Sequence, residues 1–293
     1  MNNLVCGGKW GYAGDMREID YSDVARDFLR LVGIAPARPD EAFLGRLARA
    51  FGKLPYENLT KILRAALHDD PERRLRTPDI ILAEHIDLGA GGTCFSLTNF
   101  FEQVVRFAGY DVAPVLCDRS YGADTHCALM VNANGKRFLL DPGYLLEAPI
   151  EVPISGESVQ KSPSGKVRLV RLGESSQLML ITERDGKAKI RYRLRDFPAS
   201  RERFRRRWID SFDWAMMRHM CASRQTADGQ LYVRDGLMRV VRGDSSSQER
   251  MKSGFADEIE KCFGIERRLV SLAHDAVKKI QLQKIQQPAV QQV

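Results

Sequence analysis

The chain of 293 residues lacks the cysteine patterns of disulfide-stapled and zinc-binding proteins. Its six cysteines are sparse and irregularly spaced, with no CxxC pair and no Cys/His ligand pattern. It also lacks a signal-peptide-like apolar core near the N-terminus, a repeat period, and any run approaching the ~18 apolar residues that span a bilayer. We therefore expect a cytoplasmic protein without a bound metal, whose thiols stay reduced.

The composition is that of a globular chain, with 44% hydrophobic and 28% charged residues. A chain of this length can bury a hydrophobic core without disulfide bonds or a structural metal. The length suggests one large domain or two to three small ones. The formal net charge of +7 permits an anionic partner but does not require one.

Helical spacing of apolar residues dominates the first part of the chain. This spacing predicts helices over residues 20–31 and 41–51, and a further helix opened by Pro55. It also predicts a helix from Thr77-Pro78 to Gly89 and a buried helix that begins at Cys94 and is closed by Gly109. From Val112 to about Leu194 the period changes to two and predicts strands. The Asn134-Gly135 pair gives the clearest hairpin signal. Residues 200–275 mix both patterns, with helices predicted over 257–263 and 266–277.

Cys94 is the first candidate for chemistry. It follows the glycine-rich stretch 89–92 and begins a helix, where unpaired amides and the helix dipole favour a thiolate. Glycines beside it let backbone amides approach a substrate, as an oxyanion site requires. The alternative is a small buried apolar residue at a helix start.

His126 and Asp141 are linked by the register of the predicted hairpin. If Asn134-Gly135 is a two-residue turn, Ala133 faces Lys136, and His126 and Asp141 lie diagonally on one face, within hydrogen-bonding reach. The carboxylate would orient the imidazole and leave its other nitrogen for a thiol. The alternatives are a structural histidine and a turn at Asp141-Pro142-Gly143, and a one-residue register slip would separate the pair. Cys127, which adjoins His126, is expected on the opposite face.

Four segments, in this order, resemble the arylamine N-acetyltransferase family. Pro55-Tyr56-Glu57-Asn58-Leu59 resembles its P-F-E-N-L segment, and Gly91-Gly92-Thr93-Cys94 resembles its R-G-G-x-C loop. Thr125-His126 resembles the histidine strand, and Asp141-Pro142-Gly143-Tyr144 resembles the D-V-G-F stretch. A later Thr226-Ala227-Asp228-Gly229 pattern and Phe263-Gly264-Ile265 also resemble the end of that family, so the likeness covers roughly residues 20–270.

The resemblance implies an α+β fold with a helical bundle, an antiparallel β-barrel-like middle, an α/β lid and a cysteine-protease-like core. The expected division is a flexible tail (1–16), a helical domain carrying the nucleophile (17–109), a β-barrel-like domain carrying His126 and Asp141 (110–198), a lid (199–277) and a flexible tail (278–293). The implied reaction is ping-pong transfer of an acyl group from acetyl-CoA through Cys94 to an amine, hydrazine or hydroxylamine.

The chain departs from the family pattern around the expected nucleophile. Ala90 stands where the family has arginine, Ser96 where Glu or Gln is common, and Thr98 where Asn is usual. Pro142 and Leu145 reduce the glycine content after Asp141. The acyl donor and acceptor are therefore open, and the alternatives are an amide synthase using a carrier-protein-bound acyl chain, a transglutaminase-like thiol hydrolase, and a non-catalytic binding protein.

Positive charge concentrates in residues 184–207, which contain eleven Lys or Arg and three acidic residues. Between Lys187 and Arg195 basic and apolar residues alternate, which predicts a strand with one basic face. Three interpretations remain open: a solvated surface, attraction of coenzyme A phosphates or an acyl carrier protein, and nucleic-acid binding, which no recognised motif favours.

Overall fold

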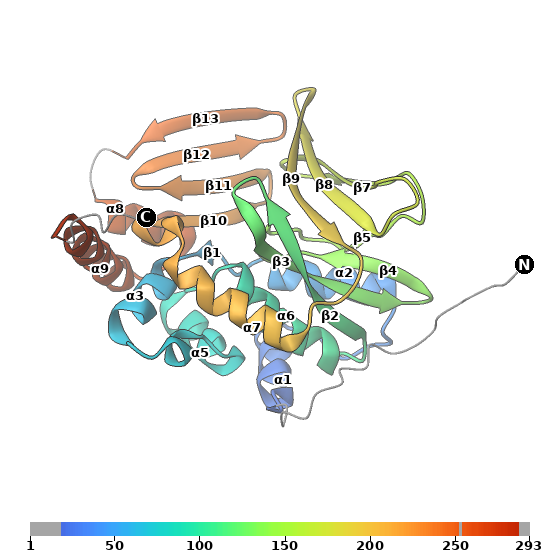
Figure 1. Cartoon of the computed structure of the whole chain (residues 1–293), viewed down its shortest axis with the longest axis horizontal. Coiled ribbons are helices and arrows are strands. Elements are labelled where there is room, and N and C mark those ends of the chain that lie inside the picture. Colours follow the sequence, from blue (N-terminus) through green and yellow to red (C-terminus); the bar gives the residue numbers. More distant parts are fainter. Residues whose placement is uncertain (1–18, 252–253, 287–293) are drawn as a thin grey trace, which may run out of the picture.

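The computed structural model describes residues 19–251 and 254–286, with side chains as far as residue 279. Within these residues the chain has the expected α+β fold, with helices that precede and flank two antiparallel sheets (Figure 1). The helices are α1 (Ser22–Leu31), α2 (Glu41–Phe51), α3 (Leu59–Leu67), α4 (Pro71–Arg74), α5 (Pro78–Leu88), α6 (Cys94–Phe107), α7 (Arg201–Asp210), α8 (Phe255–Phe263) and α9 (Arg267–Gln286), with short 3-10 turns at Ser211–Asp213 and Ala215–Arg218.

The larger sheet has eight strands in the order β5-β4-β3-β2-β9-β8-β7-β6. Its end strands β5 and β6 contact each other, so the sheet nearly closes into the expected barrel. The strands are β2 (Asp111–Arg119), β3 (Gly122–Ala133), β4 (Lys136–Leu140), β5 (Ile150–Glu151), β6 (Glu157–Ser162), β7 (Gly165–Arg171), β8 (Gln177–Arg184) and β9 (Lys187–Arg195).

The smaller sheet joins the two ends of the chain. Its order is β1-β10-β11-β12-β13, and its strands are β1 (Tyr56–Glu57), β10 (Cys221–Thr226), β11 (Gly229–Arg234), β12 (Leu237–Arg242) and β13 (Ser245–Arg250). Strand β1 pairs with β10 through Tyr56↔Ser223. Near β1, α3 also packs against α9 (Figure 1).

Two predicted helix bounds were wrong by more than two residues. The helix expected to open at Pro55 begins at Leu59, because Tyr56 and Glu57 are drawn into pairing with β10. The last helix runs to Gln286, past its expected end at Val277 and into the expected tail, since Ala276 and Val277 pack into the core and carry the helix onward. The expected N-terminal tail and residues 287–293 lie outside the described residues.

The hairpin prediction is confirmed at residue level. Ala133 faces Lys136 and Leu129 faces Leu140, with Asn134 and Gly135 both at positive φ in the turn. Such φ values are what a two-residue hairpin turn requires at both central positions. The register that links His126 to Asp141 is therefore the predicted one.

The expected regular alternation of β9 is wrong in part. Leu180 pairs with Tyr192 but Ile181 pairs with Ile190, which leaves Arg191 as an extra residue in a β-bulge. Tyr192 and Leu194 are buried, whereas Ala188 and Ile190 are exposed. The bulge changes the direction of the Arg191 side chain relative to a regular strand.

Within the part of the chain that the structure describes, the hydrophobic core consists of three clusters. One packs α1, α2 and α6 against β3 and β4, a second fills the interior of the larger sheet, and a third joins α3, the start of α6, α7, α8 and α9. The first cluster crosses the boundary expected at residue 109/110, so the division into domains stays a prediction. Among the residues that the structure describes, no helix has both the length and the hydrophobicity to cross a membrane.

Candidate active site

Cys94 is the first residue of α6, as the sequence predicts. Thr93 precedes it as the N-cap, and the Thr93 amide donates to Ser96 Oγ at 3.1 Å. Ser96, which departs from the family pattern, therefore serves here as a capping residue. The helix start places the Cys94 thiol beside unpaired amides, in a site where the side chain is 7% exposed.

The glycine loop before Cys94 is fixed by the segment around Glu57. The Glu57 amide donates to the Gly92 carbonyl at 2.9 Å, and the Gly92 amide donates to the Pro55 carbonyl at 3.2 Å. A side chain at Gly91 would overlap the Pro55 carbonyl, so only glycine allows this approach. Two of the four segments that carry the family resemblance are thus in direct contact.

His126 and Asp141 form the predicted hydrogen bond. The His126 Nε2 to Asp141 Oδ2 distance is 2.7 Å, and both side chains are buried. Burial opposes the charged imidazole, but the Asp141 carboxylate and then Cys94 outweigh it and raise the pKa of His126 to about 9. The imidazole is therefore protonated at neutral pH, with Nδ1 as the ring nitrogen left for the thiol.

The same surroundings favour the Cys94 thiolate. A hydrogen bond with Cys127, followed by the hydrogen bond and charge of His126, lowers the pKa of Cys94 well below its usual value against the opposing effect of burial. Cys127 contacts Thr98 Oγ1 at 3.5 Å, while burial raises its own pKa. Sequence reasoning missed this thiol contact, because it placed Cys127 on the strand face opposite His126 and assigned it no chemistry.

Two further groups, the Tyr192 hydroxyl and the Lys61 ammonium, were missed by sequence reasoning because they come from distant segments. The Tyr192 hydroxyl donates to Asp141 Oδ2 at 2.7 Å, and the Tyr144 amide donates to Asp141 Oδ1 at 2.8 Å. Tyr192 reaches the site only because β9 pairs with β2, and nothing local in the sequence signals that pairing.

Lys61 is the second of these groups. Its Nζ donates to the Ser211 carbonyl at 2.9 Å and to Ser211 Oγ at 2.6 Å, and it lies 4.7 Å from the Phe212 ring centroid. Burial lowers the pKa of this lysine to about 8, and its charge in turn favours the thiolate of Cys94.

A buried arginine supports the loop from another side. Arg76 Nη1 donates to the Gly91 carbonyl at 2.8 Å and to Thr60 Oγ1 at 2.7 Å, and it lies 3.6 Å from Glu57 Oε1. The family arginine is Ala90 in this chain, and a guanidinium from the segment before α5 contacts the loop instead.

A small cavity of about 40 Å³ opens beside Cys94 and His126. Its walls combine aromatic and sulfur-containing side chains with two cations: Tyr56, Phe95, Tyr121, Trp214, Met216, Met217, Lys61 and Arg119. A buried thiolate next to an imidazolium and a carboxylate can attack an acyl carbon, and the aromatic walls suit a flat, partly apolar partner. The described residues contain no group of three His, Cys, Asp or Glu placed to hold a metal ion.

The fold and the Cys94–His126–Asp141 arrangement define an α+β protein with a buried thiol, imidazole and carboxylate grouped at the start of a helix. The chain belongs to the arylamine N-acetyltransferase family, since the family model described as N-acetyltransferase matches residues 43–270.

A curated relative, the arylamine N-acetyltransferase / N-hydroxyarylamine O-acetyltransferase of Salmonella typhimurium, is 27% identical over 132 residues, which are 42% of this chain. The match spans 43% of that relative's length. The solved arylamine N-acetyltransferase of Mycobacterium abscessus superposes with a TM-score of 0.75 at 17% identity, over 91% of this chain and 99% of that one. The enzyme of Mycobacterium marinum, solved in complex with CoA, gives 0.72 at 18% identity, over 87% and 98%.

Proposed function

We propose that this protein transfers an acetyl or related acyl group from acyl-CoA to an amine, hydrazine or hydroxylamine by a ping-pong mechanism through Cys94. The observation that carries the proposal is the buried hydrogen-bonded group of Cys94, His126 and Asp141 at the start of α6. Family membership and the CoA bound to the Mycobacterium marinum relative support the choice of donor.

In the first half-reaction the Cys94 thiolate attacks the carbonyl carbon of the acyl thioester. The bond from that carbon to the sulfur of coenzyme A breaks, and the leaving thiolate takes the proton held by His126. The acyl group is then bound to Cys94 as a thioester, and His126 is neutral. The backbone amides at the start of α6 are next to Cys94. They suit the negative charge that develops on the carbonyl oxygen of the attacked thioester.

In the second half-reaction the acceptor nitrogen attacks the Cys94 thioester. His126 removes the proton from that nitrogen, and the carbon–sulfur bond breaks to release the amide and restore the thiolate. Asp141 holds the imidazole in the orientation that both proton transfers need and stabilises its charged form. The small aromatic cavity favours a flat small-molecule acceptor over a peptide.

Initial rates with acetyl-CoA and a panel of acceptors test the proposal. Arylamines and hydrazines should be acetylated with parallel double-reciprocal plots, whereas peptide amines and water should react slowly. Release of coenzyme A that depends on neither arylamine nor hydrazine would contradict the proposal and favour a thiol hydrolase. A carrier-protein thioester that reacts faster than acetyl-CoA would instead favour an amide synthase.

A further inference from the structure

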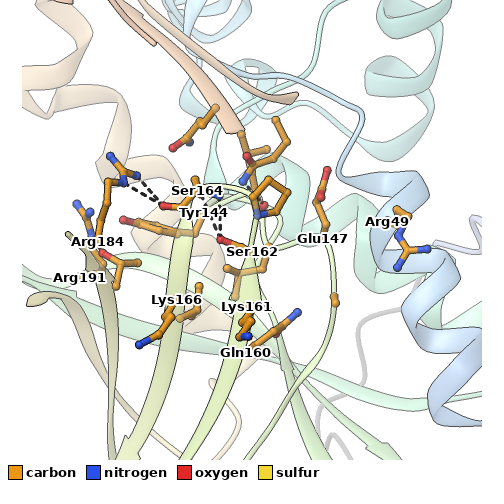
Figure 2. A pocket seen from close by; sticks show the side chains of 18 residues that line it. Arg49, Tyr144, Glu147, Gln160, Lys161, Ser162, Ser164, Lys166, Arg184 and Arg191 are labelled. Atoms are coloured by element: carbon orange, nitrogen blue, oxygen red, sulfur yellow. Dashed lines mark hydrogen bonds between the residues drawn. The ribbon is translucent and has the colours of Figure 1, made fainter. Parts of the chain in front are cut away.

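A second and larger cavity, of about 330 Å³, opens beside Tyr144 at the end of the larger sheet (Figure 2). Five cationic side chains line it, Arg49, Lys161, Lys166, Arg184 and Arg191, against a single carboxylate, Glu147. We call it the basic cavity. Figure 2 shows Arg184 and Arg191 together on one side and Arg49 on the other. Its volume lies at the lower end of the ~300–1,000 Å³ range of small-molecule sites.

Neither of the two arginines from the basic segment forms an ion pair within the residues that the structure describes, although the charge of Asp244 acts on Arg184. Arg184 donates from Nε and Nη2 to the Ser164 carbonyl, and Arg191 donates to Thr182 Oγ1 at 2.6 Å; all these partners are neutral. Burial first, and then neighbouring arginines, lower the pKa of both guanidinium groups. Partly buried like charges of this kind are stabilised by an anion that reaches all of them.

The strands place these cations together against their mutual repulsion. Lys161 and Lys166 are direct cross-strand partners on β6 and β7, a position where like charges destabilise a sheet. Arg191 is the extra residue of the β9 bulge, which lets its guanidinium lie 5.6 Å from the Tyr144 ring centroid. Bulges commonly redirect a side chain beside a functional site.

The rest of the basic segment behaves differently. On α7, Arg201 pairs with Glu102, Arg203 with Asp124, Arg206 with Glu202 and Arg207 with Asp210. The positive charge of α7 is therefore largely balanced within the molecule. Within the described part of the chain, the unpaired cations of the segment lie on β8 and β9, and among them Arg184 and Arg191 line the basic cavity.

Two buried acceptor atoms complete the cavity wall. Gln160 Oε1 and Gln225 Oε1 have no hydrogen-bond donor among the described residues. Such acceptors are suited to hydroxyl or amino groups of a ligand. Lys166 pairs with Glu183 at 3.3 Å and Glu147 offsets one more charge. The remaining cations still call for more than one negative charge, which a phosphate supplies and a single carboxylate does not.

We propose that the basic cavity binds a small phosphate ester that also carries hydroxyl or amino groups, as a nucleotide does. Tyr144 connects it to the active site, because the Tyr144 amide donates to Asp141 and the preceding residue, Gly143, lies against Cys94. The ligand is either the nucleotide end of the acyl donor or a separate phosphorylated metabolite. This inference concerns binding and does not depend on the proposed reaction.

Isothermal titration of the full chain with inorganic pyrophosphate, adenosine 3′,5′-bisphosphate and coenzyme A tests the proposal. Pyrophosphate and the bisphosphate should bind, and Arg184→Gln and Arg191→Gln should each weaken the binding at least about tenfold, the size of one charge-assisted contact. Arg206→Gln, which removes the same charge from α7, is the control and should change little. Lys161→Gln, at an exposed position, should also weaken binding, and it provides a second variant if an arginine variant unfolds.

The probes separate the two sources of the ligand. If the cavity variants also weaken coenzyme A binding, the donor's nucleotide occupies the cavity; if they weaken only pyrophosphate and bisphosphate binding, a separate metabolite does. The proposal is overturned if neither phosphate probe binds, or if the cavity variants and Arg206→Gln affect binding equally. Because the readout needs no turnover, failure of the acyl-transfer proposal would leave this result interpretable.

Discussion

At the scale of single residues, Asp141 controls the charges of the reactive pair. Its carboxylate accepts hydrogen bonds from His126, Tyr192 and the Tyr144 amide, and it helps to raise the pKa of His126 to about 9. The resulting imidazolium in turn lowers the pKa of Cys94. The thiolate is therefore present at a pH where an ordinary thiol, with a pKa near 8.5, is mostly protonated.

Replacing Asp141 by Asn tests whether its carboxylate sets the pKa values of His126 and Cys94. Without the carboxylate the pKa of His126 should fall and that of Cys94 should rise, so alkylation of Cys94 by iodoacetamide at pH 6 should slow at least about tenfold. In the unchanged protein the rate of Cys94 alkylation should stay nearly constant as the pH falls from 8.5. It should decrease only when the pH approaches the lowered pKa of Cys94. Asp87→Asn, at an exposed position, is the control. An unchanged rate in Asp141→Asn, with folding verified by thermal melting, would refute the role.

Gly143 is required by the close contact of its loop with the nucleophile. A Cβ at this position would lie 2.5 Å from Cys94 Cβ and 3.1 Å from His126 Cε1. Gly143→Ala should lower the free energy of unfolding by about 1–3 kcal/mol through overpacking, and it should slow acylation of Cys94. Gly45→Ala is a matched control, because its Cβ would meet only Pro149 Cδ at 3.9 Å, and it should be neutral or slightly stabilising in urea unfolding. Equal effects of the two changes would show that the contact is unimportant.

At the scale of elements, the nucleophile loop depends on contacts between segments that are distant in sequence. Arg76 connects the Gly91 carbonyl to Thr60 and Glu57, and Asn58 Nδ2 donates to the carbonyls of Met216 and His219. The start of α6 is thus connected both to β1 and to the chain before β10.

Arg76→Gln should weaken this arrangement by leaving the buried Glu57 carboxylate without its cation. We expect a loss of about 3–5 kcal/mol in unfolding free energy, the usual effect of removing one partner from a buried ion pair. Urea unfolding measures the loss, and Arg73→Gln, at an exposed position in α4, is the control. Stability within 1 kcal/mol of the control, a range typical of surface changes, would exclude a supporting role for Arg76.

The elements that the sequence predicted well are those with local signals. Thr77-Pro78 and Gly89 bound α5, and Asn134-Gly135 fixed the hairpin and with it the His126–Asp141 contact. Contacts that require non-local pairing could not be predicted, because no neighbouring residue encodes them. Examples are β1 with β10, the Arg191 bulge, and the approach of Tyr192 to Asp141.

At the scale of the whole molecule, the site lies between two of the core clusters. Cys94 and Cys127 belong to the cluster that includes α8 and α9, whereas Tyr192 belongs to the interior of the larger sheet. Glu102, fully buried in α6, accepts from Arg201 of α7 at 2.6 and 2.7 Å and connects two of these parts. The catalytic geometry that we propose therefore depends on the complete fold, and fragments are not expected to reproduce it.

Mass spectrometry of the intact protein mixed with acetyl-CoA, without acceptor, tests the central proposal most directly. One acetyl-sized increase should form on the unchanged protein and disappear when an arylamine is added. It should persist in Cys117→Ala, and in Cys127→Ala it should still form but more slowly, because the Cys127 hydrogen bond favours the Cys94 thiolate. It should be absent in Cys94→Ala. An adduct that survives in Cys94→Ala, or that never forms on the unchanged protein with any acyl-CoA, would contradict the assignment of Cys94 as the acyl carrier.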